Sequence, residues 1–317
     1  MEQVTLLNIP NYFSSYYLKG LNKLVKLEYK PNEEFKKFNN SPFIIFKYKK
    51  KIIIIDNRDP VGVQQNLYDI SHIYFATNKL KNKDDYRQPK IQPLFPHYPI
   101  DNSLTYLRNF RNHWVKTLGV ETVLKEIYSQ IRRPYFREYL ITPINKPYIF
   151  FSGSIWLKER EANCQRADFI RACKNDSRII FEGGLIPRKL GDTSEYEEFL
   201  GPKRFNSREF QQKSSRSLIN FNNPAVLGAV SWRLAEYLNM GTFILSLPFK
   251  VALPLPPEHG KEIHMIKSTE EIPDLFDFLL ANPIYHQKIS RGAKAYFDNY
   301  CTPKAQIIGV LKLASCT

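Results

Sequence analysis

The sequence predicts an α/β protein made of two domains, each with a parallel, doubly wound sheet. Short apolar, β-favouring runs alternate with helical patterns along the whole chain, which is the order that parallel sheets produce. The chain has 317 residues, enough for two domains of about 150 residues each. In the stretch 142–147, two prolines surround turn residues and precede a fresh apolar run, so we expect a linker there.

Apolar runs and their flanking residues define the elements of the first half. Four isoleucines stand in a row at 52–55, which is typical of a strand buried on both faces in a parallel sheet. Lysines separate this strand from one at 42–48, and they favour a tight, hairpin-like connection. The remaining predictions are a short helix within 60–68, a strand at 71–77, an extended segment at 91–99 and helices from 103 to about 130.

The second half repeats the alternation of strands and helices. Asn206 or Ser207 is placed to cap a helix that carries Glu209 in its first turn. Predicted strands are 148–153, 177–182, 217–221, 242–245 and 264–266, and predicted helices are about 162–175, 206–216, 226–240, 272–281, 282–300 and a final segment after Pro303.

The most informative stretch is 217–249, which reads as strand, loop, helix, glycine and strand. Apolar residues recur at helical spacing from Val226 to Met240. Gly241 follows where a helix often ends on a left-handed glycine. Arg233 and Glu236 are three positions apart and therefore lie on one face of this helix.

This order of elements, with its arginine, glutamate and glycine, resembles the nucleotide-sugar-binding half of GT-B glycosyltransferases of the exostosin-like or bacterial surface-polysaccharide type. The resemblance covers about 148–303 and implies two Rossmann-like domains that face a cleft. The expected domains are an acceptor-side domain at 1–145, a nucleotide-sugar domain at 146–302 and a final helix at 303–317 that packs back on the first. The implied activity is transfer of a sugar from a nucleotide-sugar to a glycan acceptor, lipid-linked acceptors included, in the synthesis of a bacterial surface polysaccharide.

The resemblance also implies a set of donor-binding residues. Glu236 would accept hydrogen bonds from the ribose, or it is a surface partner of Arg233. Helix N-termini attract phosphates, which implicates Ser231 and Arg233. Small residues at a strand end let a ligand approach the backbone, which adds Ser152 and Gly153. The other expected contacts are Lys158, Arg160 and Arg166 for the diphosphate, of which one or two should be correct, and His259 beside the donor. Glu182, with Gly183 and Gly184 after the second strand, resembles the strand-end loop that contacts the base.

The first half is expected to supply a general base. Asp59 follows the isoleucine strand, and active sites of α/β sheets form at the carboxyl ends of strands. Asp56 is a second choice, although an aspartate there commonly caps the following turn. His97 is a third choice, although a packed histidine is the more common reading. Any of these would take the proton of the acceptor hydroxyl.

No metal and no cofactor beyond the nucleotide-sugar substrate are expected. The chain lacks the Asp-x-Asp pair that holds a metal on the diphosphate in the GT-A class. Arginines, lysines and helix N-termini replace the metal in GT-B enzymes, which the resemblance carries over to this chain.

The chain is basic, with a formal net charge of +15. This charge suits phosphorylated ligands or an anionic membrane, and the segment 128–140 mixes arginines with aromatic residues. The alternative function is a non-catalytic α/β protein that binds nucleic acid or another polyanion, although no nucleic-acid motif accompanies the basic patches. Four cysteines without a CxxC pair, and no apolar run of about 20 residues, favour a cytoplasmic protein, peripheral on the inner face of the plasma membrane.

Overall fold

The computed structural model describes residues 2–187 and 193–316, and the chain forms two compact units. The first unit comprises Met1–Arg137, Val251–Leu255 and Asn299–Thr317. The second comprises Glu138–Lys250 and Pro256–Asp298. The first unit therefore ends eight residues before the expected boundary at 145, and it takes in two later segments that include the last helix.

The sheet of the first unit is mixed and has six strands in the order β2-β1-β3-β4-β5-β6. The strands are β1 (Gln3–Leu6), β2 (Lys26–Tyr29), β3 (Phe43–Tyr48), β4 (Lys51–Asp56), β5 (Ile73–Ala76) and β6 (Ile91–Pro93). The prediction of a wholly parallel sheet in this half was wrong, because β3 runs antiparallel to both β1 and β4. Lys49 and Lys50 form the turn between β3 and β4 with φ values of 47° and 68°, the left-handed pair that a two-residue hairpin requires.

Both faces of this sheet are buried. Ile45 pairs with Ile54, and both lie in a cluster with Phe35, Phe38 and Leu67. The alternate residues of the same strands point to the opposite face, where Ile44, Phe46, Ile53 and Ile55 are also fully buried. The isoleucine run thus fills two cores at once, as the sequence predicted.

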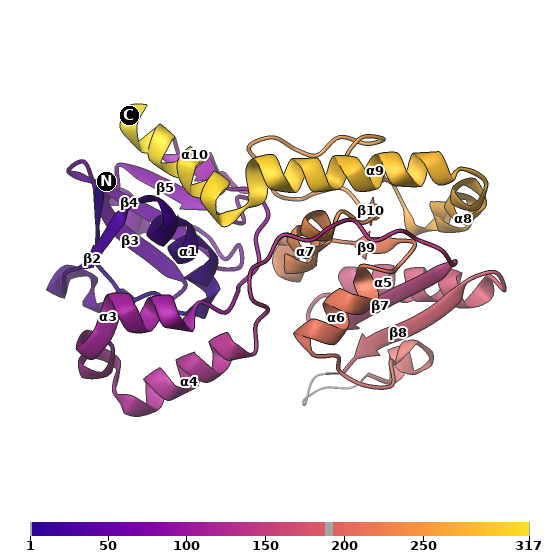
Figure 1. Cartoon of the computed structure of the whole chain (residues 1–317), viewed down its shortest axis with the longest axis horizontal. Helices are drawn as coiled ribbons and strands as arrows, with labels where there is room; N and C mark the ends of the chain where they lie inside the picture. Colours follow the sequence, from indigo (N-terminus) through magenta and orange to yellow (C-terminus); the bar gives the residue numbers. More distant parts are fainter. Residues whose placement is uncertain (1, 188–192, 317) are drawn as a thin grey trace. The chain divides into compact units, whose positions relative to one another are not determined.

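Helices of the first unit come from both ends of the chain. They are α1 (Ser15–Leu24), α2 (Gln65–Ile70), α3 (Ser103–Leu118), α4 (Val120–Ile131) and α10 (Pro303–Cys316). Helix α10 lies along α1 (Figure 1), and the Tyr16 hydroxyl donates to the carbonyl of Cys301 at 2.5 Å. A Cβ at Gly20 would lie 2.1 Å from the Pro303 carbonyl oxygen, so only glycine permits this close approach.

The strands of the second unit are all parallel. They are β7 (Tyr148–Ser154), β8 (Ile180–Ile186), β9 (Asn220–Asn222), β10 (Ile244–Ser246) and β11 (His264–Met265). Strand β7 pairs with β8, and β9, β10 and β11 form a second group. The amide of Leu218 donates to the carbonyl of Tyr148 at 2.6 Å, which connects the two groups. The predicted parallel sheet is confirmed in this unit.

The helices of the second unit are α5 (Arg160–Asn175), α6 (Ser207–Ser214), α7 (Trp232–Met240), α8 (Ile272–Ala281) and α9 (Pro283–Tyr296). The predicted cap of α6 is present, since Asn206 and Glu209 form a capping box. The prediction that α7 begins at Val226 was wrong. A short 3-10 turn at Val226–Gly228 contains Leu227 with a φ of 54°, which interrupts the helical backbone until Ser231 caps the helix.

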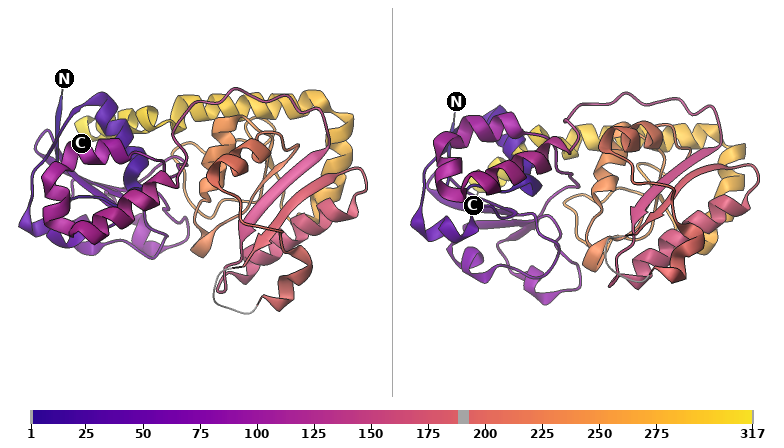
Figure 2. Two further views of the ribbon diagram at one scale, coloured as in Figure 1. Left: turned by 60° about the horizontal axis from the view of Figure 1, so that its bottom comes forward. Right: turned by 90° about the horizontal axis from the view of Figure 1, so that it is seen from below.

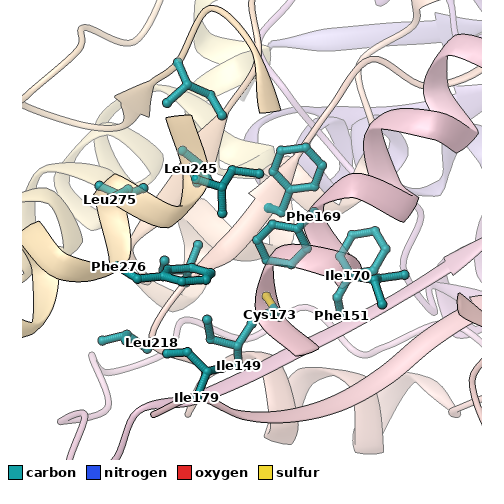
Figure 3. Packing of buried hydrophobic residues seen from close by; sticks show 14 of the residues in the cluster. Ile149, Phe151, Phe169, Ile170, Cys173, Ile179, Leu218, Leu245, Leu275 and Phe276 are labelled. Atoms are coloured by element: carbon teal, nitrogen blue, oxygen red, sulfur yellow. The ribbon is translucent and has the colours of Figure 1, made fainter. Parts of the chain in front are cut away.

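Helices cover the two faces of β7. Phe151 points to one face and packs on Phe169 of α5, with ring centroids 5.5 Å apart. Figure 3 shows the core on this face, where residues of β7, α5, β10 and α8 meet. Phe150 points to the other face and packs on Phe210 of α6 at 5.7 Å. This three-layer arrangement places the carboxyl end of β7 beside α5 and α7.

Candidate functional site

Two guanidinium groups meet the backbone at the carboxyl end of β7. Nη1 of Arg233, from α7, donates to the carbonyl oxygen of Ser152 at 3.2 Å. Nη1 of Arg166, from α5, donates to the carbonyl oxygen of Ser154 at 2.8 Å. The structure therefore brings together Ser152, Arg166 and Arg233, three of the residues that the sequence analysis expects at the donor.

Arg166 is almost completely enclosed, with 1% of its surface exposed. Its Nε donates to Oδ1 of Asn223 at 3.2 Å, so its hydrogen-bond acceptors here are an amide oxygen and a carbonyl. Burial, and then repulsion by Arg233, lowers the pKa of Arg166 to about 9. The group is still protonated at neutral pH, and an anion bound near it would relieve the cost of burying its charge.

Arg233 lies at the N-terminus of α7, where backbone amides attract anions. Ser231 caps this helix, and its Oγ accepts from Nε of Arg233 at 3.3 Å. The guanidinium also stacks over the ring of Phe151, 4.9 Å from the centroid. A Cβ at Gly153 would lie 3.4 Å from Nη1 of Arg233, so the glycine leaves room for this arginine.

Glu236 lies one turn further along α7 and is half-buried. Its Oε1 accepts from Nε2 of Gln211, on α6, at 3.2 Å. Gly241 then ends the helix in the left-handed conformation, with φ 60° and ψ 49°. The predicted helix stop is confirmed, while the role of Glu236 at a ribose stays a prediction.

Three of the predicted donor-binding residues are exposed, and the contacts given for them do not include Arg166 or Arg233. Lys158 is exposed in the turn before α5. Arg160 has 80% of its side chain exposed and forms an ion pair with Glu195 at 3.0 Å. His259 is exposed, and its Nδ1 accepts from the amide of Met265 at 2.9 Å.

Glu182 is not in a strand-end loop, and that expectation was wrong. Strand β8 continues to Ile186, so Glu182 lies within the strand. It accepts from the hydroxyl of Tyr148 at 2.7 Å and forms an ion pair with Lys213 at 2.8 Å. The following Gly183 has a φ of 111°, and a Cβ there would lie 1.9 Å from the Phe151 carbonyl oxygen.

In the first unit, the carboxyl end of β4 carries two aspartates with different surroundings. Asp56 is buried and forms an ion pair with Arg58 at 2.7 Å. It also accepts from the Tyr74 hydroxyl at 2.5 Å and from the Arg58 amide at 3.0 Å, the local turn cap that the sequence left open. Asp59 is exposed, and its role as a base stays a prediction.

His97 is packed among aromatic rings in the same unit. It is 8% exposed, and the ring centroids of Tyr17 and Tyr16 lie 4.9 Å and 6.0 Å away. Burial lowers the pKa of His97 to about 3. These surroundings match the packed histidine that the sequence analysis kept open as the more common reading.

The sequence analysis did not single out the asparagines at the end of β9. Asn222 donates from Nδ2 to the Ser246 Oγ at 2.9 Å, which ties the ends of β9 and β10 together. Asn223 donates to the carbonyl of Ala162 at 3.1 Å while it accepts from Arg166. Their position directly after an apolar run was the available signal, because polar side chains there fall at the carboxyl edge of the sheet.

Neither a cluster of metal ligands nor a membrane-spanning helix occurs among the described residues. Within 2–187 and 193–316, no three His, Cys, Asp or Glu side chains are grouped as a metal site would need. Over the same ranges, no helix is both long and apolar enough to cross a bilayer.

Comparisons with known proteins give matches to solved structures only. No protein-family model and no curated protein matches the sequence. A glycosyltransferase from Rickettsia africae ESF-5 is 11% identical, with 95% of this chain and 80% of that chain covered at a TM-score of 0.48. The C-terminal domain of a group 1 glycosyltransferase (LpcC) from Francisella tularensis is 15% identical, with 50% and 86% covered at 0.36. A UDP-GlcNAc 2-epimerase from Neisseria meningitidis, bound to UDP-GlcNAc, is 12% identical, with 98% and 100% covered at 0.43.

These matches include glycosyltransferases, the class that the sequence resembles. At such identities and TM-scores they assign no ligand and no residue role to this chain. The predicted α/β class is confirmed by the strands and helices of the two units themselves.

Proposed function

We propose that this protein is a glycosyltransferase that moves a sugar from a nucleotide-sugar to a glycan acceptor. The observation that carries the proposal is the pair Arg166 and Arg233 at the carboxyl end of β7. Their hydrogen bonds described above go to carbonyl, amide and hydroxyl oxygens, and the carboxylate of Glu159 offsets only part of the charge of Arg166. A diphosphate at the N-terminus of α7 would supply the missing negative charge.

The reaction breaks the bond between C1 of the sugar and the diphosphate oxygen, and it forms a bond between C1 and the acceptor oxygen. The electron pair of the broken bond leaves with the diphosphate, whose growing charge the two arginines stabilise. The proton of the acceptor hydroxyl passes to a base, and Asp59 is the proposed base. Glu236 is proposed to hold the ribose.

The proposal extends to finer points that follow the sequence resemblance. The acceptor is a glycan, lipid-linked or free, of a bacterial surface polysaccharide, and the enzyme acts on it at an anionic membrane. Transfer proceeds without a metal, because arginines neutralise the leaving diphosphate. Activity should therefore persist in excess EDTA, and loss of activity that manganese restores would contradict this part.

Calorimetry against UDP-, GDP-, CMP- and dTDP-linked sugars tests the donor site. One of these ligands should bind, and Arg233→Ala should weaken it about 10- to 100-fold, because a hydrogen bond to a charged group contributes about 1.5–3 kcal/mol. Arg160→Ala is the matched control, since it removes an exposed arginine of the same unit. Equal affinities for the two variants would contradict the site.

Two further outcomes would assign the protein to another class. Binding of nucleic acid but of no nucleotide-sugar, with an affinity that falls steeply with salt, would support the polyanion-binding alternative. Conversion of a donor sugar to its epimer without any acceptor would point to an epimerase.

A further inference from the structure

Helix α4 has most of its apolar side chains on the outside. The side chains that it buries include Glu126 and Gln130, which are 6% and 0% exposed, together with Val123. A helix on the surface of a soluble protein normally shows the reverse pattern, with the apolar face on the core. The outward face of α4 is therefore available for a partner.

The outward apolar residues form one continuous row, which we call the α4 stripe: Val120, Leu124, Tyr128 and Ile131. They are 61%, 61%, 57% and 55% exposed. Their spacing of four, four and three residues keeps them on one side of the helix. The row runs along nearly the whole helix, which is about 18 Å long.

Helix α3 extends this surface. Figure 2 shows α3 and α4 next to each other in the first unit, joined at Gly119. Leu104 and Leu107 of α3 are 80% and 47% exposed. The backbone of α3 bends at Arg111, where φ is 43° and ψ is −130°.

Cations surround the exposed apolar residues. From Ser103 to Arg137 the sequence has seven arginines and lysines and two glutamates, one of which is the buried Glu126. Lys125, next to Leu124, is 74% exposed and forms a solvent-exposed ion pair with Glu121, which a lipid phosphate can replace. The guanidinium of Arg132 lies 5.4 Å from the ring centroid of Tyr128 and donates to its hydroxyl at 3.2 Å.

We propose that the α4 stripe and its flanking cations dock on the surface of an anionic lipid bilayer. Apolar side chains next to Lys and Arg are what an interfacial helix needs, because the apolar face enters the acyl boundary while the cations meet lipid phosphates. Tyr128 adds an aromatic ring with a polar tip, a side chain suited to this depth.

The charge of this surface favours a lipid bilayer over two other partners, a second copy of the chain and nucleic acid. A second copy of the chain would bring two sets of like charges together, which costs free energy. Nucleic acid would satisfy the cations but would leave the apolar stripe in water. The anionic bilayer satisfies both features at once. This surface adds the membrane contact of the proposed function, yet it uses no residue of the donor site.

Co-sedimentation of the full chain with vesicles tests the proposal. The vesicles are phosphatidylcholine alone or phosphatidylcholine with phosphatidylglycerol. The chain should partition onto the anionic vesicles only, and less strongly as salt rises. Leu124→Ser with Ile131→Ser should reduce partitioning at least about tenfold. Lys125→Ser with Arg132→Ser should reduce it about 25-fold, at about fivefold per cation.

Ile284→Ser is the matched control, because Ile284 is an apolar side chain on α9 that is 81% exposed; it should partition like the unchanged protein. Absence of binding, equal binding to neutral vesicles, or unchanged binding by the stripe variants would overturn the proposal. A dimer in sedimentation equilibrium that the stripe variant abolishes would also overturn it in favour of a second copy. Nucleotide-sugar calorimetry on the same variants, without vesicles, reports on the donor site separately.

Discussion

Charged side chains gather at the carboxyl ends of both β4 and β7, but their partners differ. At β4, Asp56 is paired within the unit by Arg58 and Tyr74. At β7, the hydrogen bonds of Arg166 and Arg233 go to neutral oxygens. Asp56 is neutralised by a direct ion pair, whereas the hydrogen bonds of the two arginines reach no carboxylate and Glu159 only partly offsets the charge of Arg166. We therefore place the proposed ligand at β7 and not at β4.

The two aspartates near the end of β4 also differ from each other in burial. Asp56 is buried in its ion pair, and Asp59, three residues later, is exposed. Position at a strand end therefore does not by itself identify a reactive carboxylate. Its surroundings decide whether it stabilises the fold or can meet a substrate.

The largest expected effect concerns Asp59. Asp59→Asn should lower turnover about 10²- to 10⁴-fold, the range that a general base supplies. Nucleotide affinity should stay close to that of the unchanged protein, because Asp59 belongs to the unit without the arginine pair. Steady-state rates and calorimetry on the same variant check both statements.

The control for this assignment is His97→Gln, which should retain turnover because His97 is packed among tyrosines. Normal turnover by Asp59→Asn together with a strong loss in His97→Gln would make His97 the base. Normal turnover by both would place the base elsewhere or indicate a retaining reaction.

The next prediction concerns stability, and it tests the ion pair of Asp56 with Arg58 at the end of β4. Asp56→Asn should lower the free energy of unfolding by about 3–5 kcal/mol, because it leaves the partly buried Arg58 without its counter-charge. The same substitution at the exposed Asp59 should cost less than about 1 kcal/mol. Urea denaturation of the two variants gives the difference, and similar losses would refute the distinction.

The sequence predicted the positions of β3 and β4 better than their directions. The runs at 42–48 and 51–56 indicated β3 and β4 nearly to the residue, because their apolar character and the lysines between them were unambiguous. The antiparallel direction of β3 was indicated only by the short lysine connection, because strands joined by two residues must be antiparallel, and the apolar runs themselves carried no such signal. A buried isoleucine run looks alike in parallel and antiparallel sheets, and the left-handed turn at Lys49 and Lys50 contains no glycine or asparagine.

The arginines offer a case where a signal was present and was not used. Arg160 and Arg166 were treated alike, yet only Arg166 shares the buried face of α5. Its apolar neighbours on that face follow the helical period: Ala162, Phe169, Ile170 and Cys173. A cation in an apolar row must be compensated in the fold or by a ligand, so the helical period of the sequence already distinguishes Arg166 from Arg160.

Glu126 is a buried carboxylate whose side-chain hydrogen-bond partner, Gln130, is neutral, in contrast to Asp56 and its arginine. Gln130 donates to it at 3.4 Å, and burial raises its pKa from 4.5 to about 7. Between these values the folded protein keeps a proton that the unfolded chain releases, so stability should fall as pH rises through this window. The expected loss by pH 8 is about 3 kcal/mol.

Glu126→Gln removes the titrating group while it keeps the shape of the side chain. Urea denaturation at pH 5 and pH 8 should show a smaller loss of stability in this variant than in the unchanged protein. Equal losses in the two proteins would mean that Glu126 does not hold its proton when folded.

The last prediction concerns Glu236, the carboxylate one turn along α7 from Arg233. If it holds the ribose, Glu236→Ala removes two hydrogen bonds to a charged acceptor, each worth about 1.5–3 kcal/mol. Nucleotide-sugar affinity should then fall at least about 100-fold in a variant that still folds, and Glu236→Gln should lose less because it keeps one acceptor oxygen. Unchanged affinity together with lower stability would show that Glu236 serves the contact of α7 with Gln211 of α6. In that case the end of β7 would attract its ligand through cations alone.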